Sequence, residues 1–569
     1  MLDRFNKRTA IRLISWIMIG TLTVTLISGL ACKRITQKLD EYMQEAEEHW
    51  GFSGAVLVAV NGHVLLAKGY GRANIPIGEP NTPDTKFFIG SITKQFTAAA
   101  ILKLVEQGKI NLDSPITRYL PDWPIMIGNK ISVRHLLTHQ SGIPCYTDNP
   151  LLMLHRMEGI SQAELVDIIR ESPLEFEPGT RFKYSNSGYI VLGEIIEAVS
   201  GQSYEAFLHH EILKPAGMLD SGYGRRDAAH PQRADGYTLA ESGGLVAACP
   251  VDYSILHTAG ALYSTINDML KWDKALREGT IISYESIRQM YTPELSNYGF
   301  GWVIDERWGQ IVAHHGGFLD GFNSTFERYP AAGLCVAVFS NEDYAPVKTM
   351  AYDLAAILGG HKYHQPEERV PVPIHSERLL QYCGSYQVGP NQNRYVQADE
   401  SGLVTFRTGR SKQRLLYLGD DRFYFSTSPI RTIRFVRDLN DKVVSYVLDE
   451  GITQEPGVRI ATSTDIPSDS SDRPGNDSII DCETLTGSYH ASGLSHLPET
   501  MIHIDISCAD DGNLQLVIGQ HTVLLQPDGD GSYLHPMGDL SLTFEPATES
   551  KPISCTLKLG NGVIRAEKN

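Results

Sequence analysis

The chain of 569 residues lacks an excess of positive charge. Asp and Glu outnumber Lys and Arg by 67 to 50, the net charge is −17, and no Lys/Arg-rich run follows the N-terminal segment. Nucleic-acid binding requires a basic face, so this balance argues against a nucleic-acid partner. The acidic excess predicts a soluble surface whose charges repel one another.

Paired cysteine motifs are also missing. None of the eight cysteines forms a Cys-x-x-Cys pair, which argues against a zinc ribbon or a thioredoxin-like motif. A chain of this length can bury a core without disulfides. We therefore expect most of the cysteines to be small buried hydrophobic residues.

The N-terminal segment, residues 1–32, is predicted to lie outside the fold. Basic residues precede an uncharged, mostly apolar run from Leu13 to Ala31, and Cys32 follows at once. This order is typical of an export signal, and the run is also near the length that spans a bilayer. Two hypotheses stay open: lipid attachment to Cys32, which we favour, or an uncleaved membrane anchor. Both place the protein outside the cytoplasm, in the periplasm or at the cell surface.

Residues 33–365 alternate between strand and helix patterns. An acidic amphipathic helix is expected over 34–50, and Asn61-Gly62 between two apolar runs predicts a β-hairpin. Strand patterns return over 299–340, with breaks expected at His314–Gly321 and Tyr329-Pro330. Helices are expected between them: from Ser91 to Gly108, over 133–137, 162–171 and 189–199, and in the region 261–276, where the helix is entered at Ser264-Thr265. This order predicts an α/β domain of the α+β type, whose antiparallel sheet is built from both ends and flanked by helices.

The pattern changes near residue 365, where prolines indicate a linker. Short alternating apolar runs then predict a small all-β barrel over residues 376–462. A second, polar linker at 463–477 has too little apolar content to fold. Residues 478–569 resume the β-rich pattern, and Gly384-Ser385-Tyr386 recurs as Gly487-Ser488-Tyr489. We therefore expect two related, lipocalin-like barrels.

Ser91 and Lys94 form a Ser-x-x-Lys pattern where the first long helix begins. A spacing of three places both side chains on one helix face, one turn apart. The amine then lies within reach of the hydroxyl, and a serine hydroxyl needs a neighbouring base to become a good nucleophile. An isolated match occurs often by chance and commonly marks an ordinary surface pair, so the prediction depends on further elements.

Two further elements strengthen this prediction. Tyr184-Ser185-Asn186, ahead of a helix, offers a phenol and an amide to one cleft, although it could also be an ordinary turn. A tyrosine phenolate could accept the serine proton if a cation such as Lys94 lowered the tyrosine pKa from about 10. The glycines of His314-His315-Gly316-Gly317 would let a ligand approach the backbone, where an exposed N–H can help to form an oxyanion hole. Adjacent histidines on a strand face opposite sides, so we expect no metal there.

In order and in flanking residues, these elements resemble those of the class C β-lactamase-related serine hydrolases. This family includes penicillin-binding D-aminopeptidases, D-Ala-D-Ala carboxypeptidases, esterases and class C β-lactamases. Gly90–Ala98 is similar to its first motif, Ile131–Pro144 to its structural signature, Tyr184-Ser185-Asn186 to its second motif and His315-Gly316-Gly317 to its third. The resemblance covers roughly residues 45–360. It also marks Arg134 and His135 as structural residues.

The resemblance implies a covalent mechanism without a cofactor or metal. Ser91 would be the nucleophile, and Lys94 and Tyr184 would share the removal of its proton, with the base left undecided. Tyr184 would then protonate the leaving group, and Asn186 would orient Lys94 or a substrate amide. The backbone N–H groups of Ser91 and Phe318, next to Gly317, would hold the oxyanion.

His315 departs from the pattern of the family's β-lactamases, which carry lysine at this position. Lysine is cationic near neutral pH, whereas an imidazole is only partly so, and would hold a substrate carboxylate less firmly. The resemblance therefore favours an exported serine hydrolase of D-amino-acid peptides or small esters. A class C-like β-lactamase, a non-catalytic penicillin- or peptide-binding module and a barrel-based lipid carrier are the alternatives. The expected partner is a small molecule or short peptide; the oligomeric state is left open.

Overall fold

The computed structural model describes residues 33–461 with short gaps and, beyond residue 461, only strands β22–β29. The gaps are 149–158, 225–231, 240–243, 249–251, 253–254, 390–391, 400–401 and 408–411. The expected export signal or anchor (1–32) and the linker at 463–477 therefore lie outside the described residues. No helix within the described part of the chain combines the length and hydropathy of a membrane span.

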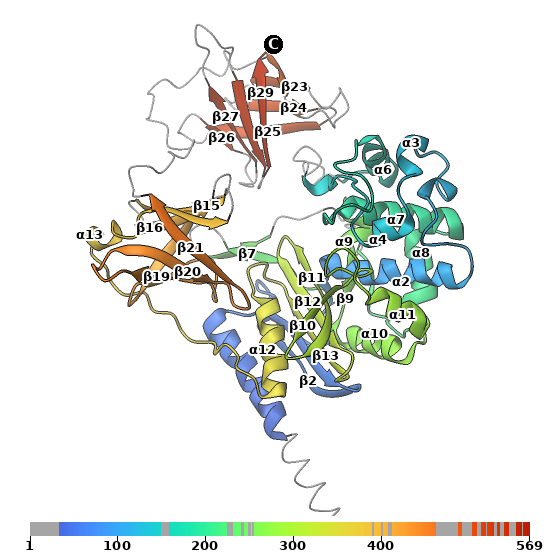
Figure 1. The fold of residues 1–569 in the computed structure, drawn as a ribbon, viewed down its shortest axis with the longest axis horizontal. Helices are drawn as coiled ribbons and strands as arrows, with labels where there is room; N and C mark the ends of the chain where they lie inside the picture. The colour runs from blue at the N-terminus through green and yellow to red at the C-terminus, as the bar shows by residue number, and fades with distance from the viewer. Residues whose placement is uncertain are drawn as a thin grey trace, which may run out of the picture.

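A six-stranded antiparallel sheet forms the centre of the first half of the chain (Figure 1). Its order is β10-β11-β12-β13-β1-β2, so strands from the two ends of the segment pair through β13 and β1. Asn61 and Gly62, both with positive φ, make the tight turn that the dipeptide predicted. The strands are β1 (Gly54–Val60), β2 (His63–Tyr70), β10 (Val303–Arg307), β11 (Gln310–Leu319), β12 (Phe322–Tyr329) and β13 (Leu334–Ser340).

One face of this sheet is covered by the helix over residues 33–50 and by α12 (Val347–Gly359). Leu39, Met43 and Ala46 lie on one side of the first helix and are buried, which confirms the amphipathic pattern. Tyr42 Oη donates a 2.8 Å hydrogen bond to Asp353 of α12, which joins the two helices.

The other face carries a helical lobe, which is visible on the right of Figure 1. Its helices and turns are η1 (Gly90–Ile92), α2 (Thr93–Glu106), η2 (Ile116–Arg118), α3 (Ile125–Gly128), α4 (Val133–Leu137), η3 (Tyr146–Asp148), α6 (Gln162–Glu171), α7 (Asn186–Ser200), α8 (Tyr204–Leu208), η4 (His209–Leu213), α9 (His257–Gly260), α10 (Ile266–Glu278) and α11 (Tyr284–Met290). Short strands connect them: β3 (Arg72–Asn74), β4 (Glu79–Pro80), β5 (Phe87–Phe88), β6 (Gly222–Tyr223), β7 (Tyr237–Leu239), β8 (Leu245–Ala247) and β9 (Leu262–Ser264). Because α2 packs against α7 and α9, and η1 packs against α9 and β11, segments far apart in sequence meet around η1.

One local expectation was wrong. The break expected at His314–Gly321 is absent, because β11 continues through Leu319 and only Asp320-Gly321 turns the chain. The helix region expected over 261–276 was predicted to be entered at Ser264-Thr265, and α10 does begin at Ile266, because Thr265 caps it by accepting a hydrogen bond from the N–H of Asp268. Residues 262–264, ahead of this cap, form strand β9.

Beyond the linker, two closed antiparallel barrels follow, as expected from the strand pattern. The first is preceded by α13 (Ser376–Leu379) and contains β14 (Gly384–Gly389), β15 (Gln392–Asp399), β16 (Gly402–Arg407), β17 (Gln413–Gly419), β18 (Arg422–Phe425), β19 (Thr432–Arg437), β20 (Val443–Asp449) and β21 (Gln454–Ala461). The second contains β22 (Gly487–Ala491), β23 (His503–Cys508), β24 (Leu514–Ile518), β25 (His521–Pro527), β26 (Ser532–Leu534), β27 (Leu540–Glu545), β28 (Ser554–Leu559) and β29 (Gly562–Lys568).

Aromatic rings fill the first barrel. Tyr382 lies 4.9 Å from Phe423 and 4.8 Å from Phe435, measured between ring centroids, and Phe435 lies 6.1 Å from Tyr446. The described interior of this barrel is therefore a packed core rather than a lipid-binding cup, which argues against the lipid-carrier hypothesis.

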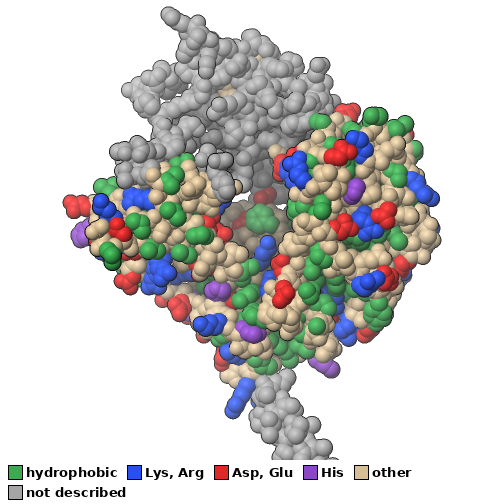
Figure 2. All heavy atoms as spheres, viewed as in Figure 1, with side chains coloured by type: hydrophobic (Ala, Val, Ile, Leu, Met, Phe, Trp, Pro, Cys, Tyr) green, Lys and Arg blue, Asp and Glu red, His purple; other side chains and the backbone are tan. Residues whose placement is uncertain are grey.

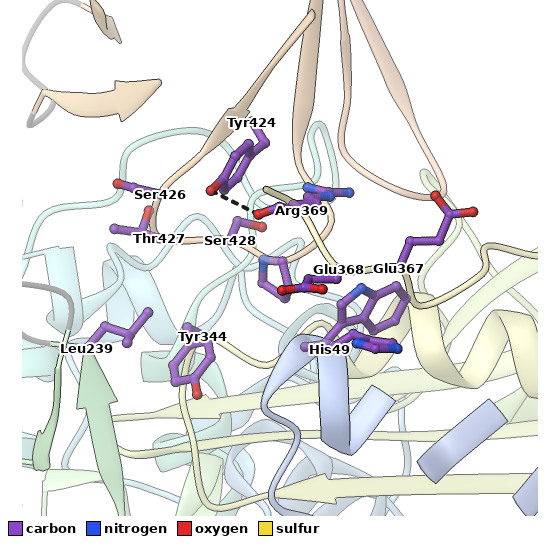
Figure 3. Close-up of a pocket in the computed structure, with 12 residues that line it drawn as sticks. His49, Leu239, Tyr344, Glu367, Glu368, Arg369, Tyr424, Ser426, Thr427 and Ser428 are labelled. Carbon is purple, nitrogen blue, oxygen red and sulfur yellow. Dashed lines mark hydrogen bonds between the residues drawn. The ribbon is translucent and has the colours of Figure 1, made fainter. Parts of the chain in front are cut away.

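The first barrel contacts the sheet domain through Ile430, which packs against the core under the helix over 33–50 and α12, and the linker residue Arg369 is bound to the same part of the barrel. Arg369 donates to the backbone oxygens of Ile430 and Arg431, and Tyr424 Oη donates to the oxygen of Arg369. A cavity of about 230 Å³, lined by Trp50 among others, lies at this junction (Figure 3). Figure 2 shows the surface hollowed between the barrel and the helical lobe, with acidic and basic side chains interspersed on the visible face.

Candidate active site

Ser91 lies in the 3-10 turn η1, two residues before α2 begins at Thr93. The serine therefore precedes the helix in which the sequence placed it. The turn keeps the expected spacing, and Lys94 Nζ lies 3.1 Å from Ser91 Oγ. The hydroxyl is partly exposed, whereas the lysine is completely buried.

The amine of Lys94 lies between two carbonyl oxygens. It donates hydrogen bonds of 2.8 Å to Oδ1 of Asn186 and 2.8 Å to the backbone oxygen of Ala259. Burial lowers the pKa of Lys94 from 10.5 to about 7, because the charged form loses its hydration. The amine is therefore neutral in a large fraction of molecules near neutral pH.

A neutral amine in this position leaves its lone pair for Ser91. A deprotonated lysine has two N–H donors. Asn186 and Ala259 accept both of them, so the lone pair faces Ser91 Oγ. The geometry suits removal of the serine proton by Lys94.

Neighbouring segments hold both carbonyl groups in place. Asn186 is the first residue of α7, and its amide Nδ2 lies 3.3 Å from Thr147 Oγ1, which turns Oδ1 towards Lys94. Ala259 lies in α9, where Thr97 of α2 donates a 2.7 Å hydrogen bond to the oxygen of Thr258. The orientation of the amine thus depends on packing between α2, α7 and α9.

Tyr184 is the second group on the nucleophile. Its hydroxyl donates a 3.0 Å hydrogen bond to Ser91 Oγ. Burial raises the tyrosine pKa above its ordinary value, and the hydrogen bond to Ser91 lowers it only in part. The condition set for a tyrosinate base, a tyrosine pKa lowered by Lys94, is therefore not met, and Tyr184 remains a phenol.

His139 holds the loop that carries Tyr184, a role the sequence prediction missed. Its backbone oxygen accepts from the N–H of Lys183 at 3.0 Å, and its Nδ1 accepts from the N–H of Ser185 at 3.1 Å. Its ring lies 4.2 Å from the ring of Tyr184. His139 also has a φ of 56°, uncommon for a residue with a side chain. The only signal in sequence was its place within the Ile131–Pro144 motif.

His315 is neutral, and both of its ring nitrogens are engaged. Nδ1 lies 2.6 Å from the oxygen of Gly316, which can only accept, so Nδ1 carries the proton. Nε2 then accepts from Tyr298 Oη at 2.9 Å. Burial, reinforced by the charge of Lys94, lowers the pKa of His315 to about 3. His314 faces the other way and pairs with Asp305.

The glycines of β11 bring its backbone against the nucleophile turn. A Cβ on Gly317 would lie 1.8 Å from the oxygen of Ile89, and one on Gly90 would lie 2.9 Å from the nitrogen of Phe318. Glycine is required at both positions, because any side chain would push the strand and the turn apart. The backbone N of Phe318 therefore lies beside Gly90, the residue before Ser91, which is the side from which an oxyanion hole at Ser91 would need a donor.

Arg134 and His135 contact the scaffold, as expected. Arg134 forms a 2.6 Å ion pair with Asp113 and a longer one with Glu294. His135 closes a capping box with Ser132 at the start of α4.

Comparisons with known proteins agree with this geometry. The profile of the beta-lactamase family matches residues 35–359. A penicillin-binding protein of Bacillus subtilis strain 168 is 28% identical over 436 residues, which are 72% of this chain and 95% of the relative. An octameric penicillin-binding protein homologue from Pyrococcus abyssi has a TM-score of 0.53 and 28% identity, over 74% of this chain and 99% of its own. A D-amino acid amidase from Ochrobactrum anthropi SV3, complexed with L-phenylalanine amide, has a TM-score of 0.50 and 26% identity, over 58% of this chain and 98% of its own.

The reactivity of Ser91 should depend on pH through Lys94. We expect the rate of labelling by a fluorophosphonate to rise as Lys94 loses its proton, with a midpoint near its pKa of about 7. Lys94→Met should lower this rate by about 10²–10⁴-fold and remove the pH dependence. Ser91→Ala is the control that should not label. Labelling of Lys94→Met at the parent rate would contradict the role of the amine.

Substitution of His139 should impair Ser91 through Tyr184. His139→Ala removes the acceptor for Ser185 and strains the positive φ, and we expect labelling to slow by up to about 10²-fold with the fold retained. His139→Asn is the matched control, since Oδ1 can replace Nδ1 and asparagine tolerates positive φ. It should retain more activity than alanine. Equal rates in the two variants, with equal circular dichroism, would contradict this role.

Proposed function

Because the chain belongs to the beta-lactamase family and is a serine hydrolase, we propose that it cleaves D-amino-acid amides or short D-amino-acid peptides through an acyl-enzyme on Ser91. The observation that carries this choice is the neutral, doubly hydrogen-bonded His315. An imidazole in this state offers no positive charge to a substrate carboxylate. Substrates that end in an amide or ester, rather than a carboxylate, fit such a site best.

In the proposed reaction, Lys94 and Tyr184 act in the acylation of Ser91 and act again in the hydrolysis of the acyl-enzyme. Neutral Lys94 accepts the proton of Ser91 Oγ as the oxygen forms a bond to the carbonyl carbon. The carbonyl oxygen becomes an oxyanion, held by the N–H groups of Ser91 and Phe318. Tyr184 gives its proton to the departing amine nitrogen and regains one from Lys94.

Hydrolysis of the acyl-enzyme completes the cycle in this proposal. A water molecule gives its proton to the same pair of groups and attacks the ester carbon, and Ser91 leaves with a proton. The raised pKa of Tyr184 supports its assignment as acid, and the lowered pKa of Lys94 supports its assignment as base. Asn186 is assigned to orient the lysine amine, which it contacts at 2.8 Å.

Hydrolysis of β-lactams is the second candidate, and the family match favours it. β-Lactams carry a carboxylate, which the site would bind weakly for the reason given above. We therefore expect them to acylate Ser91 without rapid turnover. A purely binding role is disfavoured, because the groups needed for acylation lie within hydrogen-bond distance of one another.

A comparison of substrates tests the proposed function. We expect D-phenylalanine amide or D-alanine amide to be hydrolysed with a kcat/KM at least about tenfold above that of a chromogenic cephalosporin, and Ser91→Ala to abolish both activities. N-Acyl D-alanyl-D-alanine and p-nitrophenyl esters complete the panel. Rapid cephalosporin turnover with no amidase activity would replace the proposal with the β-lactamase alternative.

We also propose that the enzyme acts outside the cytoplasm, attached to the membrane through residues 1–32. The apolar run before Cys32 supports this. A lipid on Cys32 predicts that an alkyne fatty acid labels the full chain and that Cys32→Ser loses both the label and the membrane fraction. An anchor helix predicts unlabelled protein that stays in the membrane fraction in both forms. Recovery of the unlabelled parent protein in the cytoplasm would contradict the proposal.

A further inference from the structure

One end of the first barrel carries more arginine than carboxylate. Val396, Leu403 and Ile433 belong to the buried core of this barrel. Side chains alternate along a strand, so Arg394, Arg407 and Arg431 face inward on the same strands or strand extensions. They lie at the end of the barrel where the β20–β21 turn touches α12. A Cβ added to Gly451 in this turn would lie 2.4 Å from Oγ1 of Thr349.

Two glutamates pair with these three arginines. Glu455 accepts from Nε of Arg394 at 3.0 Å and also contacts Arg407, so one carboxylate serves two guanidinium groups. Glu450 lies 2.9 Å from Arg431. Within this group of five side chains, three cations against two carboxylates leave one positive charge, and we name the group the arginine mouth of the barrel.

Hydrogen bonding is incomplete at the same place. Among the described residues, nothing accepts a hydrogen bond from Nε of Arg407 or from Nε of Arg431, although both atoms are buried. A buried donor without a partner costs about 1–3 kcal/mol. Residues 408–411, Thr-Gly-Arg-Ser, follow Arg407 and contain no carboxylate that could balance the charge.

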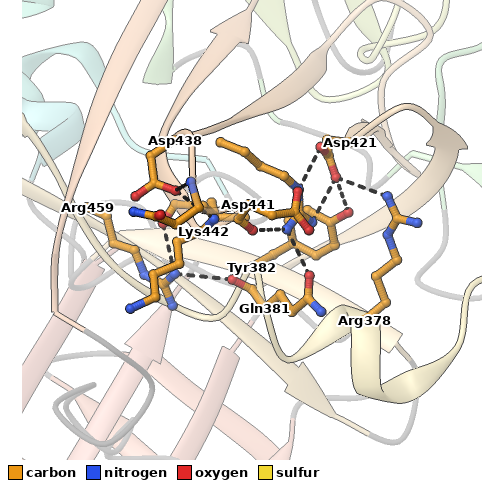
Figure 4. Close-up of polar contacts among 11 residues, drawn as sticks. Arg378, Gln381, Tyr382, Asp421, Asp438, Asp441, Lys442 and Arg459 are labelled. Atoms are coloured by element: carbon orange, nitrogen blue, oxygen red, sulfur yellow. Dashed lines mark hydrogen bonds and ion pairs between the residues drawn. The ribbon is translucent and has the colours of Figure 1, made fainter.

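The opposite end of the barrel differs. There the guanidinium of Arg437 donates from all three nitrogens: to both oxygens of Asp421, to Gln381 and to the backbone oxygen of Asp441. Figure 4 labels these three partners. An arginine inside this barrel can therefore be fully satisfied by the chain itself. Arg459 at that opposite end also keeps a buried Nε without an acceptor among the described residues. What distinguishes the arginine mouth is that two such atoms belong to neighbouring guanidinium groups.

The three arginines lie close enough to interact and open enough to be reached. Burial lowers the pKa of the Arg431 guanidinium, Glu450 opposes this, and the charges of Arg394 and Arg407 lower it further. The side chain of Arg394 is 6% exposed and that of Arg407 is 40% exposed. Arg394 thus forms the buried part of the group, and Arg407 forms its solvent-accessible part.

We propose that the arginine mouth binds one small oxyanion, a carboxylate or a phosphate group, between Arg407 and Arg431. Guanidinium groups bind either anion through paired N–H donors in a planar fork. One bound anion would cancel the excess charge and accept from the two free Nε–H groups. The site is separate from Ser91 and requires no catalysis, so it goes beyond the proposed function.

Titration calorimetry on the full chain carrying Ser91→Ala tests this proposal, with ionic strength held constant by NaCl. N-acetylglycine and methyl phosphate are the two probes, and they distinguish a carboxylate from a phosphate ligand. We expect one of them to bind with a stoichiometry of one. Arg407→Gln should weaken binding about tenfold or more, because it removes a charge-assisted partner.

Two further variants separate binding from folding. Glu450→Gln removes a negative charge from the arginine mouth and should tighten anion binding, which a purely structural role would not produce. Arg378→Gln lies at the opposite end, where the side chain is 50% exposed, and should leave binding unchanged. Failure of both probes to bind saturably, or equal binding in the parent and in Arg407→Gln, would overturn the proposal. Anion binding requires no catalysis, so failure of the amidase assay would not contradict this proposal.

Discussion

The removal of one lysine amine from water is the interaction on which the rest of the site depends. Lys94 is completely buried, and its pKa falls to about 7. Two carbonyl oxygens take the N–H groups of the neutral amine and direct its lone pair towards Ser91. The same burial keeps Tyr184 protonated and His315 neutral. The proposed base, the proposed acid and the uncharged imidazole thus have one common physical cause, a low-dielectric site enclosed by α2, α7, α9 and β11.

The architecture serves this site by joining distant parts of the chain. The sheet pairs β1 with β13, which brings the β11 edge beside the turn that follows β5. Close contact there is possible only because Gly90 and Gly317 have no side chains. Ser324 of β12 strengthens the junction by donating to the oxygen of Ile89. The backbone donors of the proposed oxyanion hole therefore belong to η1 and β11, which are packed against each other, rather than to loops.

Much of this could be predicted from sequence, because side-chain motifs mark their own chemistry. Ser91, Lys94, Tyr184 and Asn186 stand in short motifs, and the structure brings them together. The contact between Lys94 and the backbone oxygen of Ala259 could not be predicted from the sequence, since any residue type supplies a carbonyl. The neutrality of His315 depends on Tyr298, which only the folded chain brings near. The glycines of β11 predicted a break, because their need for close packing against Ile89 arises from tertiary contact.

The central claim, that burial holds Lys94 as a neutral amine near physiological pH, can be measured directly. Titration of the ε-methylene carbon of Lys94 by NMR, in protein labelled with ¹³C-lysine and assigned through Lys94→Met, follows its charge without any substrate. The account predicts a midpoint near the pKa of about 7. A midpoint close to the ordinary lysine value of 10.5 would contradict it.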